Sequence, residues 1–433
     1  MSRFDLGFKY TNIHFIGIGG INMSALAEVL FRDGYVISGS DKQDSPAVAH
    51  LRKLGITVYV GHEASNLADA VQVVVHNAAV GHGNPERVEA AARGLHIIDR
   101  AELLGLLMRN YENAICVAGT HGKTTTTSML AEIFMQAGAD PTVMSGGVLP
   151  SMGGAMRIAA NKEYFIAEAC EYHDSFLKFY PKVGIILNLE KDHSDYFDNE
   201  DGLWRSFRRF AEKIPADGVL IINSEIKNFS EIVGGLKCGV IGFNDAVYKL
   251  IPPLRVPGEH NIANASAAWL VAQHFGLELD KVDEALRNFT GAKRRFERLG
   301  KFNDADIIDD YAHHPTEVAA TLTAAKSLNP ARLWVIFQAH THNRTREFLQ
   351  EFAEALKLAD FCIITDIYRP AGREEEKAEV HAKDLAALLE NSIYMPNFDE
   401  IVSYLQENLQ PQDMAISMGA GDIHKVTENL LQI

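Results

Sequence analysis

The chain has 433 residues, of which 47% are hydrophobic and 23% are charged, and its formal net charge at pH 7 is −16. This length exceeds what one hydrophobic core normally serves, so we expect roughly two to four domains. The negative charge disfavours nucleic acid or an anionic membrane surface as a partner.

The cysteines and the hydropathy pattern indicate where in the cell the protein is expected. The four cysteines have no CxxC spacing, which is typical of a reducing environment. The sequence also lacks an apolar run of about 18 residues, the length that a membrane-spanning helix needs. We therefore predict a cytoplasmic protein without stable membrane insertion, and we predict no particular oligomeric state.

The N-terminal part alternates between short apolar runs and helical stretches. Residues 13–18 and 35–38 are predicted strands on either side of a helical pattern at residues 23–32, and further strand-like runs lie at residues 56–60 and 71–75. This alternation is typical of a doubly wound, Rossmann-like α/β domain.

A glycine turn, Gly17-Ile-Gly19-Gly20, follows the first of these strands. It is similar to a dinucleotide fingerprint, and Asp41 lies where an acid would meet a ribose hydroxyl. However, Asn22 stands at the position of the third glycine. From this stretch alone, an NAD site, another nucleotide site and a simple tight turn all remain open.

A second turn, GTHGKTTTT at residues 119–127, lies between an apolar run at residues 114–118 and a helical pattern at residues 124–137. Backbone N–H groups and the helix dipole make such a strand-to-helix turn an anion site. Lys123 adds a positive charge, and the Thr124 hydroxyl is suited to a magnesium ion. Val117 replaces the first glycine of the usual phosphate-loop motif, so the match is to the shorter G-T-x-G-K-[ST] form. A threonine-rich helix cap is the alternative, but the context favours a nucleoside triphosphate.

Two more strands of the central part end in potential metal ligands. Glu168 follows the run at residues 164–167, and His193 follows the run at residues 183–187 together with two acids. The carboxyl ends of parallel strands meet at one edge of a sheet, so Glu168 and His193 are predicted to converge on the metal that Thr124 also binds. The alternative is that residues 190–193 cap the next helix.

Residues 257–264, PGEHNIAN, precede a helix expected at residues 265–275. His260, Asn261 and Asn264 offer imidazole and amide groups that suit a purine edge or a phosphate. A helix N-cap is the alternative, and the spacing does not separate the two.

A basic connector at residues 289–298 leads into a third α/β segment, with strands expected at residues 307–309, 333–337, 361–365 and 415–418. Polar clusters directly follow two of these strands: IDDYAHHP at residues 308–315 and FQAHTHNR at residues 337–344. Packing alone explains such clusters poorly, so both are candidate functional sites.

The predicted fold class is therefore α/β with three domains. A Rossmann-like N-terminal domain is expected at residues 1–109. A central P-loop-type ATPase domain with a mostly parallel sheet is expected at residues 110–290. A C-terminal Rossmann-like α/β domain is expected at residues 291–433.

Nine motifs in chain order resemble those of the Mur ligases of peptidoglycan synthesis: GIGGINMSALAEVL, AGTHGKTTTTSM, EACEY, NLEKDHSDYF, GEHNIANASAA, RRFERLG, DDYAHHPTE, FQAHTHNRT and MGAGDI. They span nearly the whole chain, and the pattern is most similar to the member that joins L-alanine to UDP-N-acetylmuramate. The resemblance implies an ATP-dependent amide ligase that takes ATP, UDP-N-acetylmuramate and L-alanine and uses Mg²⁺, with Mn²⁺ as an alternative. It also implies that the first domain binds the UDP-sugar, the second binds ATP, and the third binds the amino acid and closes over both.

The resemblance implies a role for each candidate residue. The residues implied for the UDP-sugar are Gly17, Gly19, Gly20, Met23, Ser24, Asp41, His76, Asn77 and Ala78. Those implied for ATP are Gly119, Thr120, His121, Gly122, Lys123, Thr124, Thr125, His260, Asn261, Asn264, Arg295 and Asp310. The implied metal ligands are Thr124, Glu168 and His193, and the amino-acid site is implied at Tyr311, His313, His340 and Arg344. The implied catalytic residues are Lys123, Glu168, His193, His313, His340 and Arg344.

The chemistry implied is activation of a carboxylate by ATP to an acyl phosphate, which a neutral amine then attacks. A base such as His313 or His340 would help the amine, and the sequence does not choose between them.

Two positions depart from the family pattern. Arg208 stands where many members carry a carbamylated lysine after the metal-binding histidine, so we expect no carbamylated lysine. Thr341 stands where relatives carry an arginine, which leaves Arg344 as the main cation nearby.

Three other functions fit the sequence less well. A recycling ligase that attaches a tripeptide to the same nucleotide sugar usually lacks the GIGG turn of residues 17–20. A nonhydrolysing nucleotide sensor is disfavoured by the presence of Lys123, Glu168 and His193. An NAD-dependent oxidoreductase is disfavoured by Asn22 and by the triphosphate loop.

Overall fold

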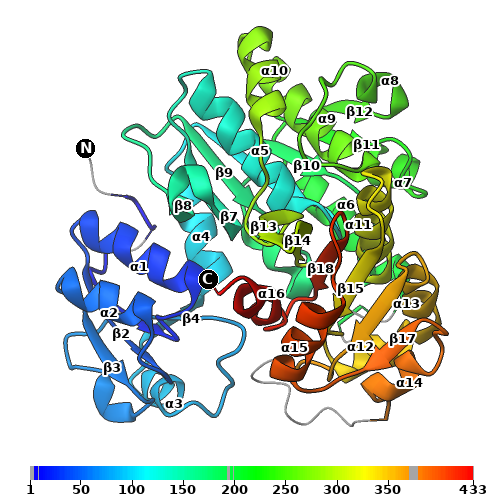
Figure 1. Cartoon of the computed structure of the whole chain (residues 1–433). Coiled ribbons are helices and arrows are strands. Elements are labelled where there is room, and N and C mark those ends of the chain that lie inside the picture. Colours follow the sequence, from blue (N-terminus) through cyan, green and yellow to red (C-terminus); the bar gives the residue numbers. More distant parts are fainter. Residues whose placement is uncertain (1–3, 8, 193–195, 198, 370–378, 433) are drawn as a thin grey trace. The chain divides into compact units, whose positions relative to one another are not determined.

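The computed structural model describes residues 4–7, 9–192, 196–197, 199–369 and 379–432 (Figure 1). The chain forms two compact units. The first comprises Met1–Pro252 and Ala263–Leu286, and the second comprises Pro253–Ile262 and Arg287–Ile433. The first unit holds two sheets and the second holds one.

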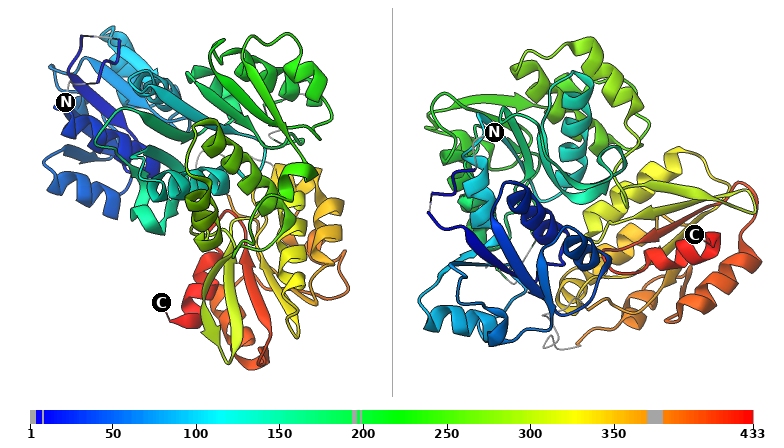
Figure 2. Two further views of the ribbon diagram at one scale, coloured as in Figure 1. Left: turned by 90° about the horizontal axis from the view of Figure 1, so that it is seen from above. Right: turned by 90° about the vertical axis from the view of Figure 1, so that its left-hand side faces the viewer.

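The first sheet has five parallel strands in the order β3-β2-β1-β4-β5. Its elements are β1 (Asn12–Ile16), α1 (Ile21–Arg32), β2 (Val36–Asp41), α2 (Pro46–Lys53), β3 (Thr57–Val60), η1 (Ala64–Asn66), β4 (Val73–His76), α3 (Pro85–Ala92), β5 (His96–Asp99) and α4 (Arg100–Met108). The strand order reverses at β1, because β2 follows on one side and β4 lies on the other. Ligands of such sheets bind beyond the carboxyl ends of the strands at this reversal. Figure 2 shows this sheet, in blue, with helices packed beside it.

The second sheet has seven strands in the order β12-β11-β10-β6-β9-β7-β8, and only β8 runs antiparallel to its neighbour. Its strands are β6 (Asn113–Ala118), β7 (Thr142–Leu149), β8 (Gly154–Arg157), β9 (Tyr164–Glu168), β10 (Val183–Ile186), β11 (Val219–Asn223) and β12 (Gly239–Phe243). Its helices are α5 (Lys123–Gln136), η2 (Pro150–Met152), η3 (Tyr172–Lys178), α6 (Glu200–Glu212), α7 (Phe229–Val233), α8 (Asp245–Tyr248), α9 (Glu259–His274) and α10 (Leu279–Asn288).

The sheet of the second unit has six strands in the order β13-β14-β18-β15-β16-β17, and β13 is its antiparallel edge strand. Its strands are β13 (Glu297–Phe302), β14 (Ala305–Asp310), β15 (Leu333–Phe337), β16 (Phe361–Ile364), β17 (Ser392–Tyr394) and β18 (Met414–Met418). Its helices are α11 (Pro315–Ser327), α12 (His342–Glu347), α13 (Leu349–Leu356), α14 (Ala382–Ala386), α15 (Phe398–Asn408) and α16 (His424–Leu431).

These observations confirm the predicted α/β class with mostly parallel sheets. The apolar runs that predicted strands are buried in the sheets, as continuous apolar runs in parallel sheets are expected to be; all residues of β15 and β18, for example, are buried. The domain boundaries at residues 109 and 290 remain predictions. Among the described residues, none of the helices is long and apolar enough to cross a membrane.

Two local predictions were wrong. The connector expected at residues 289–298 ends inside β13, an edge strand with mostly polar residues and no apolar run to reveal it. The helix expected at residues 265–275 already begins at Glu259, because the amide-rich residues that resemble a cap lie within its first turns. Both errors arose where polar composition masked a regular backbone.

Candidate active site

The phosphate loop connects β6 to α5 and needs two glycines in positive-φ conformations. Gly119 has φ +142° and Gly122, the residue before the helix, has φ +83°. A Cβ at Gly119 would lie 3.0 Å from the Leu187 Cβ, so a larger residue would be both strained in this backbone conformation and crowded against the residue after β10. The loop therefore makes a tight turn into α5. The first N–H groups of this helix and its dipole favour an anion.

Lys123 is held by its own loop and by one carboxylate. Its Nζ donates to the Gly119 carbonyl at 2.5 Å, to the Thr120 carbonyl at 3.0 Å and to Glu171 Oε2 at 3.0 Å. Burial, the largest single influence, would lower the pKa of the ammonium. The charge and hydrogen bond of Glu171, together with the charges of Cys170 and Glu168, outweigh burial and raise the pKa above its ordinary value. The lysine therefore stays positively charged where a phosphate is expected.

Thr124 and Glu168, both predicted as metal ligands, meet directly. The Thr124 hydroxyl donates to Glu168 Oε2 at 3.1 Å, and Glu168 Oε1 accepts from the Ser145 hydroxyl at 3.2 Å and from the Gly146 N–H. A Cβ at Gly146 would lie 2.7 Å from Glu168 Oε2, so the carboxylate sits against a bare glycine backbone. A hydroxyl and a carboxylate are hard oxygen donors, a set that fits Mg²⁺ or Mn²⁺.

The third predicted ligand, His193, lies outside the described residues. The segment that leads to it is nonetheless fixed to the phosphate loop. The Asn188 side chain accepts from the His121 N–H at 2.8 Å and donates to the His121 carbonyl at 3.0 Å, while the Thr120 hydroxyl accepts from the Glu190 N–H at 3.0 Å.

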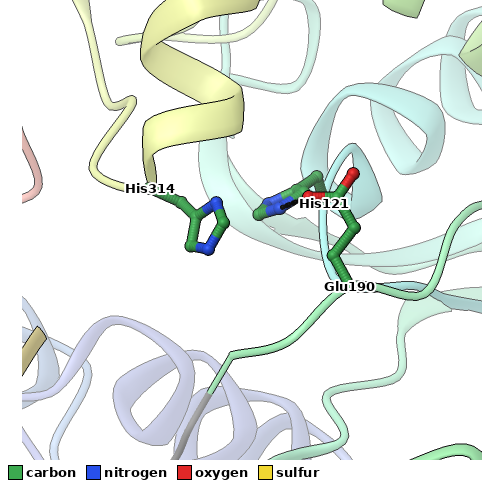
Figure 3. Close-up of side chains that lie close together, drawn as sticks. All are labelled: His121, Glu190 and His314. Carbon is green, nitrogen blue, oxygen red and sulfur yellow. Dashed lines mark ion pairs between the residues drawn. The ribbon is translucent and has the colours of Figure 1, made fainter. Parts of the chain in front are cut away.

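The side chains of His121 and Glu190 also form an ion pair, with His121 Nε2 3.5 Å from Glu190 Oε2 (Figure 3). Figure 3 also draws His314, which belongs to the second unit. There it precedes α11, and its Nδ1 accepts from the Thr316 N–H at 3.3 Å. His121 was predicted to bind ATP, and its pairing with Glu190 keeps the ring beside the loop.

The three polar residues at the start of α9 divide between the units. Asn264 belongs to the first unit, and its side chain lies so close to Gly122 that a Cβ there would collide with it. His260 and Asn261 belong to the second unit; His260 is exposed, and the buried Asn261 donates to the Pro257 carbonyl at 2.7 Å. The structure thus places Asn264 beside the phosphate loop.

The first glycine turn is built by the end of β2. The Ser40 carbonyl accepts from the N–H groups of Gly17 at 2.8 Å and Ile18 at 2.9 Å, and Asp41 Oδ2 accepts from the Gly19 N–H at 2.8 Å. Gly17 has φ +79°. Asp41, predicted to face the ribose, therefore also holds the turn through a backbone N–H.

The other residues predicted for the UDP-sugar lie around this turn. Met23 is buried in the first turn of α1, and the Ser24 hydroxyl donates to the Ile21 carbonyl at 3.0 Å. His76 ends β4, and burial lowers its pKa below the ordinary value. A Cβ at Gly17 would lie 3.1 Å from the Asn77 Nδ2, and Ala78 is exposed next to it. The segment after β4 is therefore adjacent to the turn.

In the second unit, three of the predicted amino-acid residues form a row of rings. The ring centroids of Tyr311 and His313 lie 5.4 Å apart, and those of His313 and His340 lie 5.6 Å apart. The row continues to Tyr368, which stacks on His340 at 5.8 Å and was not identified from the sequence. Arg344 lies on α12, where its N–H donates to the Thr341 hydroxyl at 3.4 Å.

Thr341 has φ +66°, a conformation that is strained for a β-branched residue. The backbone next to His340 is therefore held in an unusual shape by its surroundings.

Arg295 and Asp310 lie next to this row. The Arg295 guanidinium is 5.0 Å from the Tyr311 ring centroid. The Asp310 carboxyl accepts from the N–H groups of Phe296 and Ala312, both at 2.7 Å. Burial raises the pKa of Asp310 to about 6, and the Arg295 charge opposes this only in part.

Comparison with known proteins covers nearly the whole chain. Three family models match: the catalytic domain of the Mur ligase family at residues 12–112, the Mur ligase middle domain at residues 117–251, and the Mur ligase glutamate ligase domain at residues 294–421. The chain is 44% identical to UDP-N-acetylmuramate--L-alanine ligase of Agathobacter rectalis, over 98% of each chain. It is 42% identical to the enzyme of that name from Acetivibrio thermocellus, over 98% of this chain and 96% of the relative.

Solved structures are similar along the full length as well. The UDP-N-acetylmuramate-alanine ligase of Thermotoga maritima matches with a TM-score of 0.78 and 28% identity, over 97% of this chain and 98% of that one. A murein peptide ligase from Psychrobacter arcticus matches with a TM-score of 0.71 and 25% identity, over 98% of each chain.

Proposed function

The chain belongs to the Mur ligase family, as its motifs predicted, and on that premise we propose that it joins L-alanine to the lactyl carboxylate of UDP-N-acetylmuramate at the expense of ATP. The reaction passes through an acyl phosphate, releases ADP and phosphate, and supplies a precursor of peptidoglycan. The observation that carries the proposal is the phosphate loop with Lys123 directly beside the Thr124–Glu168 pair. It occurs in a chain that is 44% and 42% identical to two relatives named UDP-N-acetylmuramate--L-alanine ligase.

The first step needs two anions to meet. A carboxylate is a poor acyl donor, because its leaving group would be oxide, so its oxygen first attacks the γ-phosphorus of ATP and ADP leaves. Lys123 offsets the repulsion between the anions and stabilises the transferring phosphoryl group. Thr124 and Glu168, with His193, would hold a divalent cation, which when bound supplies further positive charge to the same phosphates.

The second step forms the amide. The amine of L-alanine attacks the acyl carbon, and phosphate leaves as the tetrahedral intermediate collapses. The amine must be neutral when it attacks, so a ring nitrogen of His313 or His340 accepts its proton. Tyr311 and Arg344 complete this amino-acid site, with the Arg344 guanidinium available for the carboxylate of alanine.

The nucleotide sites divide among the remaining residues. The turn of Gly17, Gly19 and Gly20, with Met23, Ser24, Asp41, His76, Asn77 and Ala78, binds the UDP-sugar. Residues 119–125 with His260, Asn261, Asn264, Arg295 and Asp310 bind ATP. The proposed function involves no nucleic acid and no insertion into a membrane.

Alanine-dependent release of ADP in the presence of UDP-N-acetylmuramate tests the proposal. We expect turnover with L-alanine and none when either acceptor or amine is omitted. A tripeptide amine, which a murein peptide ligase would prefer, serves as the competing substrate. Turnover with the tripeptide but not with L-alanine would show the recycling activity instead of the proposed one. No turnover with either amine would contradict the proposed function.

A further inference from the structure

A carboxylate lies completely buried in the N-terminal part of the first unit, outside every role given above. Glu86 is in the first turn of α3 and its side chain is 0% exposed. Its Oε2 accepts from the Ser40 hydroxyl at 2.6 Å and lies 3.2 Å from His14 Nε2, and its Oε1 accepts from Asn66 Nδ2 at 2.6 Å. The Glu63 N–H adds a fourth contact, at 3.3 Å from Oε1.

These contacts keep Glu86 ionised in a place where a charge is costly. Burial alone would raise the pKa of the carboxyl, but hydrogen bonds from His14, Ser40 and Asn66 outweigh it and hold the pKa below its ordinary value. An apolar side chain of similar size would serve packing at least as well as a buried charge. The network therefore calls for a role other than stability.

The network leads directly to the glycine turn. Ser40, whose hydroxyl bonds to Glu86, is the residue whose carbonyl accepts from the N–H groups of Gly17 and Ile18. The next residue, Asp41, holds the Gly19 N–H. A shift of Ser40 would therefore move three consecutive backbone N–H groups of the turn together.

Two neighbouring segments are fixed to the same place. Asn66 Nδ2 donates to the Gly61 carbonyl at 3.1 Å as well as to Glu86, and the Gly61 N–H donates to the Asp41 carbonyl at 2.8 Å. The segment after β3 is thus joined to the end of β2.

The segment after β4 is fixed as well, by the residue that follows Glu86. Arg87 Nη1 donates to the Val80 carbonyl at 2.6 Å. The first turn of α3 therefore holds the end of β2 and the segments that follow β3 and β4, all at the carboxyl edge where a nucleotide is expected.

We propose that Glu86 is a positioning residue for the UDP-sugar, acting through Ser40 to aim the N–H groups of the glycine turn. This inference rests on the proposed function, because it takes the turn to be the UDP-sugar site. Glu86 itself does not touch the ligand. Its loss would weaken binding of the nucleotide sugar while leaving the phosphate loop and its use of ATP intact.

The test uses the full-length protein and two variants, Glu86→Gln and the milder Ser40→Ala. Titration calorimetry gives the Kd for UDP-N-acetylmuramate, and steady-state kinetics give KM for each substrate. We expect each variant to raise Kd and KM for the UDP-sugar by about tenfold or more, which matches the loss of one buried hydrogen bond to a charged group. The KM for ATP should stay within about twofold, and the double variant should fall short of the product of the two single effects.

Asp413→Asn is the matched control. Asp413 is a buried carboxylate of the second unit that accepts from Arg332 and Trp334, so its loss should lower the melting temperature without changing the KM for the UDP-sugar. The inference would be overturned if both single variants fold and melt at a lower temperature but keep the wild-type Kd for UDP-N-acetylmuramate. It would also be overturned if the KM rose equally for all three substrates. Wild-type protein that does not bind UDP-N-acetylmuramate would instead overturn the proposed function.

Discussion

The ammonium of Lys123 lies 3.0 Å from the Glu171 carboxylate, which is 1% exposed. Two backbone carbonyls of the phosphate loop accept from the same ammonium. All three acceptors hold the lysine on its own loop, and a nucleoside triphosphate must compete with them for its positive charge. Removing Lys123 therefore tests whether the two proposed nucleotide sites are separate.

Replacing Lys123 with alanine should abolish turnover and leave the UDP-sugar site intact. The lysine charge acts on the transferring phosphoryl group, so we expect kcat to fall by on the order of 10²- to 10³-fold or more. The glycine turn follows β1 of the five-stranded sheet, whereas Lys123 follows β6 of the seven-stranded sheet, so the Kd for UDP-N-acetylmuramate should stay within about twofold of wild type. Calorimetry and ADP release measure the two quantities. Loss of both in a folded variant would contradict separate nucleotide sites.

Replacing Glu171 with glutamine should strengthen ATP binding. The variant keeps the shape of the side chain but removes the negative charge that competes with phosphate for Lys123. We expect the Kd for ATP to fall roughly threefold to tenfold, the equivalent of about 1 kcal/mol. Glu212→Gln, on the exposed pair with Arg208, removes the same charge elsewhere in the unit and should leave the Kd unchanged. Weaker ATP binding in Glu171→Gln would instead mean that this carboxylate assists the nucleotide.

Replacing Glu168 with glutamine should raise the Mg²⁺ concentration needed for activity. The Glu168 carboxylate accepts from the Thr124 hydroxyl and the Gly146 N–H, and an amide oxygen in its place is a weaker metal ligand. Half-maximal activity should therefore require a Mg²⁺ concentration at least about tenfold higher than in the wild type. Thr124→Ser keeps the hydroxyl and serves as the matched control, with a Mg²⁺ requirement near wild type. An unchanged Mg²⁺ curve in Glu168→Gln would show that the cation is held by other residues.

The sequence predicted the parts of the molecule in which local pattern and chemistry coincide. An apolar run, a glycine turn and a helix follow one another within residues 113–136, so the phosphate loop needed no tertiary information. Glu168 and His193 were predicted to converge on the metal that Thr124 also binds, because both follow strands of the sheet that owns the phosphate loop. The structure places the Thr124 hydroxyl 3.1 Å from Glu168 Oε2, and His193 lies outside the described residues.

What the sequence missed depends on contacts between distant segments. Glu171 lies 48 positions from Lys123, and Glu86 lies 46 positions from Ser40, so no spacing rule joins either pair. The local signal for Glu86 was an acid in the first turn of a helix, which is common in ordinary helix caps. Tyr368 gave no signal at all, since a single aromatic residue after a strand usually belongs to a core.

The buried carboxyl of Asp310 should make the stability of the ligand-free protein depend on pH between about 4 and 6. Burial raises its pKa to about 6 in the folded chain, whereas an aspartate in an unfolded chain titrates near 3.9. Between these values the folded state holds a proton that the unfolded state has lost. Stability from this group is therefore fully present below about pH 4 and is lost as the pH rises through about 6, by up to about 3 kcal/mol.

Asp310→Asn isolates this contribution. The asparagine Oδ1 still accepts from the Phe296 and Ala312 N–H groups but does not titrate, so the other ionisable groups cancel when variant and wild type are compared at each pH. Melting temperatures measured from pH 4 to pH 7 should show the variant gaining on the wild type as the pH rises. A difference that stays constant over this range would mean that Asp310 is already ionised at pH 4, and that Arg295 stabilises its charge more strongly than burial opposes it.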